Sequence, residues 1–221
     1  MRITSNHLQT QIVKRISIQF LLSLPEGYED EEIEWGLILF LHGMDRRGED
    51  MSKLENYGIL GIGKGLSLPF IIAVPQCPTE SYWNMERDAV VALITELTAN
   101  YRVDSNRIYL IGYSMGAYGI WDLAIHYPDM FAAIVPISSG GQVSKAARLK
   151  TTPVWAFHGA LDNIVPIEQM TGMIHAVEQY QSNIKLTMYP ELGHDILECT
   201  LNKQELYEWL LEHKKETGTK T

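Results

Sequence analysis

The chain has 221 residues and a net charge of −9, from 27 acidic and 18 basic side chains. This charge repels phosphate backbones and argues against a nucleic-acid partner. Hydrophobic residues make up 46% and charged residues 20%, a globular mixture that excludes a disordered chain. We expect one α/β domain over residues 1–221, in which 214–221 form a frayed polar tail.

The two cysteines, Cys77 and Cys199, lie far apart and form no disulfide framework or zinc pattern. The first ten residues lack the apolar core of a secretory signal. Apolar runs such as 37–41 are too short to cross a bilayer. We therefore expect a soluble, cytoplasmic protein with no membrane partner and no metal or other cofactor; the pattern favours no oligomeric state.

Short apolar runs alternate with helical patterns along the chain. Apolar alternation or continuous apolar stretches predict strands at 12–24, 36–41, 70–74, 107–111, 131–137, 153–157 and 184–189. Helical periodicity predicts helices at 84–100, 115–126, 167–181 and 201–213. This alternation predicts a mostly parallel central sheet with helices on both faces, whose strands end along one edge where ligands bind.

The segment after the predicted strand 107–111 reads Gly-Tyr-Ser-Met-Gly, with Ser114 at its centre. A serine in a sharp strand-to-helix turn exposes its hydroxyl, and glycines at 112 and 116 avoid collisions there. The N-terminus of the next helix presents free N–H groups and a positive dipole end to the same point. Ser114 is thus a candidate nucleophile.

A serine hydroxyl needs a base, and the base needs an orienting acid. His194 follows Gly193 just after the last predicted strand, and Asp162 follows the preceding strand. The order Ser114, Asp162, His194 is the one expected for this architecture. Asp195 and Glu191 are weaker alternative acids.

The other histidines and a glycine-rich segment suit structural roles better. His158 precedes Asp162 and breaks the expected order, and the remaining histidines are His7, His126, His175 and His213, at termini or in helices. Residues 58–65 imitate a phosphate-binding loop, but Gly65 stands where a hydroxyl residue is required. We expect no nucleotide there.

The loop after the predicted strand 36–41 begins Leu-His-Gly-Met-Asp. Gly43 allows the backbone to approach a substrate, and the N–H groups of Met44 and Met115 are candidate oxyanion donors. We expect His42 to orient this loop through hydrogen bonds.

These motifs resemble the α/β-hydrolase superfamily over about residues 12–213. Within it the chain is similar to small bacterial carboxylesterases and predicted peptidases related to phospholipase/carboxylesterases. The resemblance is carried by Leu41-His42-Gly43, Pro75-Gln76-Cys77-Pro78 with Trp83, Gly112 to Gly116, and Gly193-His194. It implies that Trp83 walls a substrate pocket; a core tryptophan at a helix start is an equal alternative.

Two features bear on the pocket that the resemblance implies. Relatives carry small residues after His-Gly, whereas Met44 and Asp45 stand here, and this carboxylate disfavours anionic substrates. Cap domains in this superfamily enter after the strand predicted at 131–137, but only residues 138–152 separate it from the next strand. We therefore expect no cap domain and an open, shallow cleft.

The sequence thus predicts a serine hydrolase that cleaves short, soluble carboxylic esters through an acyl-enzyme. Ser114 is the predicted nucleophile, His194 the base and Asp162 its orienting acid. Two alternatives remain: a peptidase or acyl thioesterase with the same three residues, and an inactive binding protein on this fold. The partner expected in the first case is a small-molecule ester.

Overall fold

The computed structural model describes residues 3–11, 13–30, 32–63 and 65–215. Its centre is a seven-stranded sheet in the order β1-β3-β2-β4-β5-β6-β7, in which all neighbours from β3 to β7 are parallel and β1 is antiparallel. The strands are β1 (Phe20–Ser23), β2 (Trp35–Leu41), β3 (Phe70–Pro75), β4 (Val103–Tyr113), β5 (Ala133–Ile137), β6 (Val154–Gly159) and β7 (Ile184–Tyr189). The predicted α/β class and mostly parallel sheet are confirmed.

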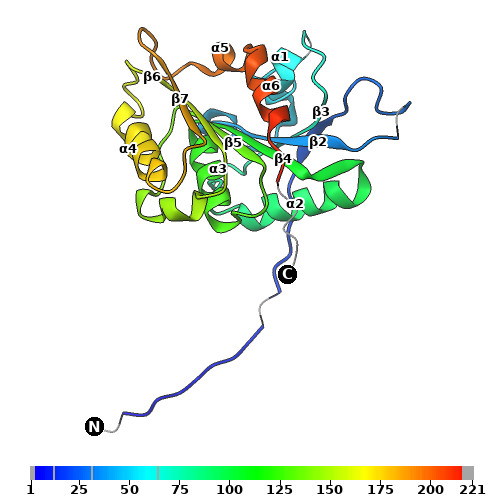
Figure 1. Ribbon diagram of the computed structural model, residues 1–221. Helices are drawn as coiled ribbons and strands as arrows, with labels where there is room; N and C mark the ends of the chain where they lie inside the picture. The colour runs from blue at the N-terminus through cyan, green and yellow to red at the C-terminus, as the bar shows by residue number, and fades with distance from the viewer. Residues whose placement is uncertain (1–2, 12, 31, 64, 216–221) are drawn as a thin grey trace.

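Helices cover both faces of this sheet (Figure 1). One face is covered by α2 (Arg87–Asn100), α3 (Met115–His126) and α4 (Ile167–Glu178), and the other by α1 (Gly58–Gly63), α5 (Leu197–Leu201) and α6 (Gln204–Glu212). Strands β2 and β3 are buried along their whole length, as continuous apolar runs between two helical layers require. Each face carries its own apolar core, so the sheet is rigidly held between them.

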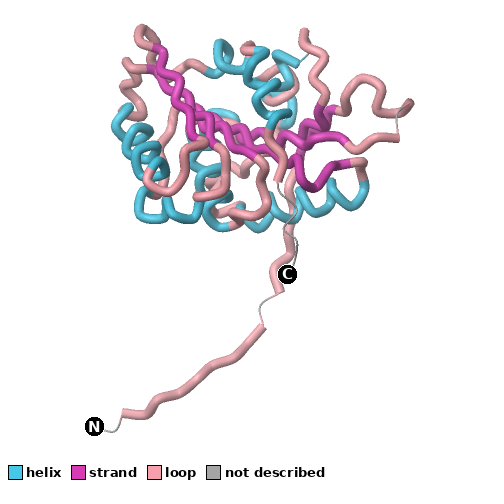
Figure 2. The backbone as a smooth tube through the Cα atoms, in the orientation of Figure 1, coloured by secondary structure: helices cyan, strands magenta, loops and turns pink. Residues whose placement is uncertain are grey.

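The first predicted strand is much shorter than expected. Only 20–23 of the predicted 12–24 form a strand, while 13–19 contain no regular structure and residue 12 lies outside the described residues. The partner explains this limit: Phe20 pairs with Pro75, the last residue of β3, and the N–H of Gln76 donates to the carbonyl of Gln19. Residues before this point have no ladder to join: Ile18 and Lys14 still contact the body, and residues 3–11 run away from it (Figure 2).

Other differences concern short elements and strand ends. β4 begins at Val103 rather than 107, because Trp35 pairs with Val103 across an irregular register that extends the ladder through a polar segment. The last helix begins at Gln204 and is preceded by α5, which is only five residues long. The glycine-rich segment forms α1, and three 3₁₀ helices are η1 (Met44–Arg46), η2 (Met51–Lys53) and η3 (Val143–Leu149). Elements this short carry no readable periodicity.

The fold brings the loops after β2, β4, β5, β6 and β7 to one edge of the sheet, because all five strands run in the same direction. The segment between β5 and β6 contains one regular element, the short helix η3. No described helix combines the length and the apolar character needed to cross a bilayer. The candidate functional residues follow β2, β4, β6 and β7, except Trp83, which lies between β3 and α2.

Candidate active site

Ser114 occupies the sharp turn between β4 and α3. Its backbone has φ 52° and ψ −119°, a left-handed conformation that costs a non-glycine residue on the order of 1–3 kcal/mol. Its N–H donates to the carbonyl of Ile137 on β5, which fixes the turn against the neighbouring strand. The strain is held by the surrounding sheet, and it places the serine at the N-terminus of the twelve-residue α3.

The two glycines that flank Ser114 are required by close backbone packing. A Cβ at Gly112 would collide with the backbone of Gly116, and a Cβ at Gly116 would collide with the carbonyl of Leu41. The turn is therefore pressed against the end of β2, where the next loop of the site begins. This is the physical reason for glycine at both positions.

The structure brings Ser114, His194 and Asp162 into contact in the predicted order. The Ser114 hydroxyl lies 2.9 Å from Nε2 of His194, and Nδ1 of His194 lies 2.7 Å from Oδ2 of Asp162. Because the carboxylate accepts a hydrogen bond from Nδ1–H, Nε2 has a free lone pair and the serine hydroxyl donates to it. The imidazole contacts Asp162 rather than the alternatives Asp195 or Glu191. Its side chain is 12% exposed, whereas the Asp162 carboxylate is fully buried.

Close contact between the last two loops places His194 beside Asp162. A Cβ at Gly159 would collide with the carbonyl of Gly193, and the N–H of Leu161 donates to the carbonyl of Leu192 at 2.9 Å. The loop after β6 is thus bound directly to the loop after β7. Gly159 makes the approach possible because it has no side chain.

Ser138 holds the backbone of His194 from the end of β5. Its hydroxyl donates to the His194 carbonyl at 2.9 Å, and its own backbone has φ 54°. The N–H of Ser138 donates to the carbonyl of Phe157 on β6. Tyr113 lies against the same histidine, with ring centroids 5.3 Å apart. His194 is therefore fixed by contacts from three neighbouring strands.

Asp162 is held as a carboxylate by hydrogen bonds. Burial alone would raise its pKa, but the N–H of Val165, the imidazole of His194 and the N–H of Ile164 together outweigh this and lower the pKa below its ordinary value. The two backbone groups donate to Oδ1 at 2.8 and 2.9 Å, which leaves Oδ2 for the histidine. The group is charged at neutral pH and oriented for His194.

A second, buried histidine lies against the same carboxylate. His158, at the end of β6, is fully buried; its Nε2 lies 2.9 Å from the Val165 carbonyl and 3.3 Å from Oδ2 of Asp162. Nε2–H therefore donates to the carbonyl, and Nδ1 has no hydrogen-bond partner among the described residues. His158 fills the space beneath Asp162 without reaching Ser114.

The candidate oxyanion donors both stand at the start of a helix. Met44 is the first residue of η1, after extended Gly43, and Met115 is the first residue of α3. The first N–H groups of a helix have no partner within it, and among the described residues neither of these two donates a hydrogen bond. A Cβ at Gly43 would press on the Tyr113 ring at 3.2 Å. Both N–H groups are available to a ligand at Ser114.

His42 orients the loop after β2, as expected. Its Nδ1–H donates to the Gly43 carbonyl at 2.7 Å, its Nε2 accepts from the N–H of Cys77 at 3.1 Å, and its carbonyl accepts from Trp83 Nε1 at 3.0 Å. Complete burial lowers its pKa to about 4, although the bond to the Gly43 carbonyl opposes this shift. The ring is neutral at pH 7 and serves as a fixed support.

A cavity of about 280 Å³ opens beside Ser114. The buried ring of Trp83 forms part of its wall, so this residue both packs in the core and faces the site. Asp45 forms an exposed ion pair with Arg46 at 3.3 Å rather than pointing to a buried partner. The loops around the cavity come from four separate segments of the chain.

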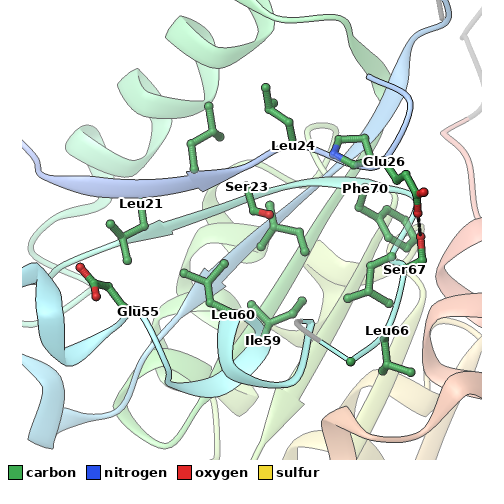
Figure 3. A pocket seen from close by; sticks show the side chains of 15 residues that line it. Leu21, Ser23, Leu24, Glu26, Glu55, Ile59, Leu60, Leu66, Ser67 and Phe70 are labelled. Carbon is green, nitrogen blue, oxygen red and sulfur yellow. Dashed lines mark hydrogen bonds between the residues drawn. The ribbon is translucent and has the colours of Figure 1, made fainter. Parts of the chain in front are cut away.

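Two larger hollows lie away from these residues. One, of about 610 Å³, lies between β1, α1 and the segment before β3, and its rim carries a hydrogen bond from Ser67 to Glu26 (Figure 3). The other, of about 750 Å³, lies near the C-terminal ends of α2 and α3. Neither contains a nucleophile with its base. Reactive groups rather than volume therefore identify the candidate active site, and the described residues contain no cluster of three metal-ligating side chains.

Comparison with known proteins agrees with this geometry. The sequence model of the dienelactone hydrolase family matches residues 79–204, more than half of the chain. The chain belongs to this family. The matched range includes the serine, the aspartate and the histidine of the site, but it leaves out the loop with Gly43 and Met44.

Individual relatives of this dienelactone hydrolase family member are esterases. A bifunctional acetylxylan esterase/xylanase of Neocallimastix patriciarum is 25% identical over 143 residues, which cover 62% of this chain and 21% of that protein. The crystal structure of a thermostable esterase is 29% identical with a TM-score of 0.75, over 89% of this chain and 59% of that one. The chain thus covers about a fifth of the length of the first protein and somewhat over half of the length of the second.

The fold likeness extends to a phospholipase/carboxylesterase from Dyadobacter fermentans DSM 18053. That structure is 19% identical with a TM-score of 0.67, over 90% of this chain and 99% of that one. At this identity the likeness shows the fold alone. The α/β-hydrolase fold expected from the sequence is confirmed.

Several site residues were missed by sequence reasoning. Ser138 and Gly159 act through contacts with the loop after β7, which is distant in the chain, so only the folded sheet reveals them. His158, for which the sequence favoured a structural role, contacts Asp162 only four residues later. One local signal was available. The Asp162 carboxylate accepts hydrogen bonds from the N–H groups two and three residues later, and such a side-chain-capped turn is typical of aspartate. Such a turn marks Asp162 as an oriented carboxylate.

Proposed function

We propose that this protein is a carboxylesterase that hydrolyses short-chain, soluble esters through an acyl-enzyme. The observation that carries the proposal is the continuous hydrogen-bonded path from the Ser114 hydroxyl through His194 to Asp162, at 2.9 and 2.7 Å. The first distance allows direct proton transfer from Ser114 to His194, and the second is a hydrogen bond that orients the imidazole. The esterase relatives support the same chemistry.

In the first half-reaction, Oγ of Ser114 attacks the ester carbonyl while its proton passes to Nε2 of His194. The carbonyl oxygen becomes an oxyanion, and the N–H groups of Met44 and Met115 donate to it. The tetrahedral intermediate collapses as Nε2–H protonates the leaving alcohol, and the acyl group remains on Oγ. Asp162 keeps Nδ1 protonated and stabilises the imidazolium.

In the second half-reaction, His194 removes a proton from water, which attacks the acyl-enzyme carbonyl. The same two N–H groups stabilise the second oxyanion. Its collapse releases the carboxylic acid, and the proton on Nε2 returns to Ser114. The proton that water gives up replaces the one that left with the alcohol, so Ser114 and His194 return to their starting states.

The direct test is Ser114→Ala with 4-nitrophenyl acetate. Loss of the nucleophile is expected to lower kcat by at least about 10⁴-fold, because such residues act as a unit in serine hydrolases. Circular dichroism and thermal unfolding serve as the control for folding. Turnover by the pure variant at more than a few per cent of the wild-type rate would contradict the proposal.

Three classes of acyl compound separate this proposal from the alternatives of the same mechanism. Side-by-side kcat/KM values on butyrate esters, acyl thioesters and short peptide amides are expected to be highest for the ester. A peptide amide turned over faster than the ester would assign the site to a peptidase.

A further inference from the structure

The cavity beside Ser114 lies on one defined side of the reacting carbonyl. Its lining includes Ser114 and both proposed oxyanion residues, Met44 and Met115, and His194 is not among the described residues that line it. The leaving alcohol must lie next to the histidine that protonates it. The cavity therefore lies on the other side of the carbonyl, where the acyl group of the substrate extends.

The wall of this cavity is apolar and carries no charge among the described residues. Besides the three residues at the reaction centre, its lining consists of Tyr82, Trp83, Asn84, Tyr118, Gly119, Ile164 and Val165. The polar atoms of two aromatic side chains are already engaged: Trp83 Nε1 donates to the His42 carbonyl, and the Tyr118 hydroxyl donates to Oε1 of Gln169 at 2.5 Å. A ligand therefore meets mainly ring and aliphatic surface.

The one cation that packs against this wall is committed to other partners in the described structure. Arg47 stacks on the Tyr82 ring, 5.0 Å from its centroid, donates to the carbonyls of Ser81 and Met44 at 3.1 and 3.3 Å, and is not among the residues that line the cavity. Asp45, which follows Met44 directly, forms an ion pair with Arg46 at 3.3 Å, so neither of these two charges is free for a ligand. A carboxylate on the acyl group would lose its water here without gaining a charged partner.

We propose that this cavity is an acyl-binding pocket selective for uncharged, apolar acyl groups of about four to eight carbons, and that it rejects acyl groups bearing a carboxylate. The proposal rests on the proposed esterase function. Its size limit follows from the volume: at roughly 30 Å³ for a water-sized group, 280 Å³ holds on the order of nine such groups. Acetyl leaves most of this space empty, and a long fatty-acyl chain exceeds it.

Chain length tests the apolar part of the proposal. Each methylene moved from water into an apolar pocket is worth about a fourfold gain in affinity. For 4-nitrophenyl esters, kcat/KM is therefore expected to rise about 15-fold from acetate to butyrate and to fall again for palmitate in detergent. A constant or decreasing kcat/KM from acetate to hexanoate would overturn it.

A matched pair of esters tests the charge selectivity. Mono-4-nitrophenyl glutarate and 4-nitrophenyl pentanoate have similar acyl lengths, but only the first carries a carboxylate. The glutarate is expected to be at least about 100-fold poorer in kcat/KM because of the uncompensated loss of water. The ratio should persist in 0.5 M NaCl, since screening weakens long-range repulsion by the net charge of −9 but not a local desolvation cost.

A charge-switch variant tests the location. Asn84 lines the cavity and its side chain is exposed, so Asn84→Lys places a cation at the mouth. The glutarate-to-pentanoate ratio is expected to rise at least about tenfold, whereas Asn84→Gln leaves it unchanged. Asn202→Lys, on the exposed end of α5, makes the same change in net charge and should also leave the ratio unchanged.

The results separate this inference from the function on which it rests. Equal rates on both esters, abolished together by Ser114→Ala, would overturn the acyl pocket and leave the esterase proposal standing. An equal gain in Asn84→Lys and Asn202→Lys would also overturn it, because the selectivity would then come from overall charge. Hydrolysis that survives Ser114→Ala would instead remove the proposed function itself.

Discussion

Two histidines lie on loops at the same edge of the sheet, yet their surroundings differ in one decisive respect. His42, after β2, is fully buried and both of its ring nitrogens contact backbone groups. His194, after β7, is partly accessible and its ring nitrogens contact two side chains, a hydroxyl and a carboxylate. Backbone partners fix a ring, whereas ionisable and nucleophilic partners let it exchange protons.

The largest expected effect separates the two histidines by activity and by stability. His194→Ala is expected to lower kcat on 4-nitrophenyl butyrate by about 10⁵-fold or more and to cost less stability than His42→Ala, because water can enter the partly accessible site and hydrogen-bond to Asp162. His42→Ala strands the Cys77 N–H and leaves a gap in the core, so it is expected to cost about 2–4 kcal/mol of stability.

Urea unfolding and steady-state kinetics on both variants measure this contrast. Activity is normalised to the folded fraction, so that a destabilised His42→Ala is compared fairly. A His42→Ala variant that stays folded but loses as much kcat as His194→Ala would contradict the division between support and proton transfer.

The next largest effect tests the Met44 N–H, which lies on the loop that His42 orients. Met44→Pro removes the proposed oxyanion donor, and proline is tolerated at the first residue of a helix after an extended Gly43. Loss of one such donor is expected to lower kcat by about 10²–10³-fold with little change in KM.

Met44→Ala keeps the N–H and is the matched control, for which we expect less than about a tenfold change. Equal activity of the proline and alanine variants would exclude the Met44 N–H from the oxyanion site.

The stability of the protein should depend on pH through His42, whose ring is a neutral support. Its pKa is lowered to about 4 in the folded state and returns to about 6.5 on unfolding. The unfolded state therefore binds the proton more strongly, so stability is complete above about pH 6.5 and falls as the pH drops towards 4. The shift corresponds to about 3 kcal/mol.

Urea unfolding at pH 7 and pH 4 of the wild type and His42→Ala isolates this contribution. The stability gap between the two proteins is expected to shrink at pH 4. The lowered pKa of Asp162 does not interfere, because this carboxylate is present in both proteins and its contribution cancels in the gap between them. A gap that grows on acidification would show that His42 is charged in the folded protein.

The smallest expected effect concerns the support of His194. Ser138→Ala removes the hydroxyl that donates to the His194 carbonyl at 2.9 Å. We expect a fall in kcat of about three- to tenfold, from one lost hydrogen bond to the backbone of the base. Ser139→Ala is the adjacent control, because the described structure gives the buried Ser139 hydroxyl no partner. Equal effects of both substitutions would assign the loss to packing.

Much of this architecture is predictable because local sequence determines it. Continuous apolar runs mark strands covered on both faces, and helix α3 has the bounds predicted from its sequence, 115–126. Ser114, Asp162 and His194 are predictable because each follows a strand that ends at the same edge. The glycines at 112 and 116 follow from the geometry of the turn between β4 and α3.

The remainder depends on contacts across the fold. The length of β1 is set by where β3 ends rather than by the alternation of residues 12–24. Short α1 and α5 each lie in the same apolar layer, through Ile59 and Leu201, and exist because they complete that core. Ser138 contacts the His194 backbone only once neighbouring strands align.

The most direct test of the central claim is to trap the acyl group on the enzyme. Rapid mixing with excess 4-nitrophenyl butyrate, acid quenching and peptide mass spectrometry are expected to show one butyryl group per chain on the peptide that contains Ser114. No such adduct is expected in His194→Ala on the same timescale. A butyryl group on another residue, or full turnover by active wild-type enzyme that never carries a Ser114 adduct, would contradict the account.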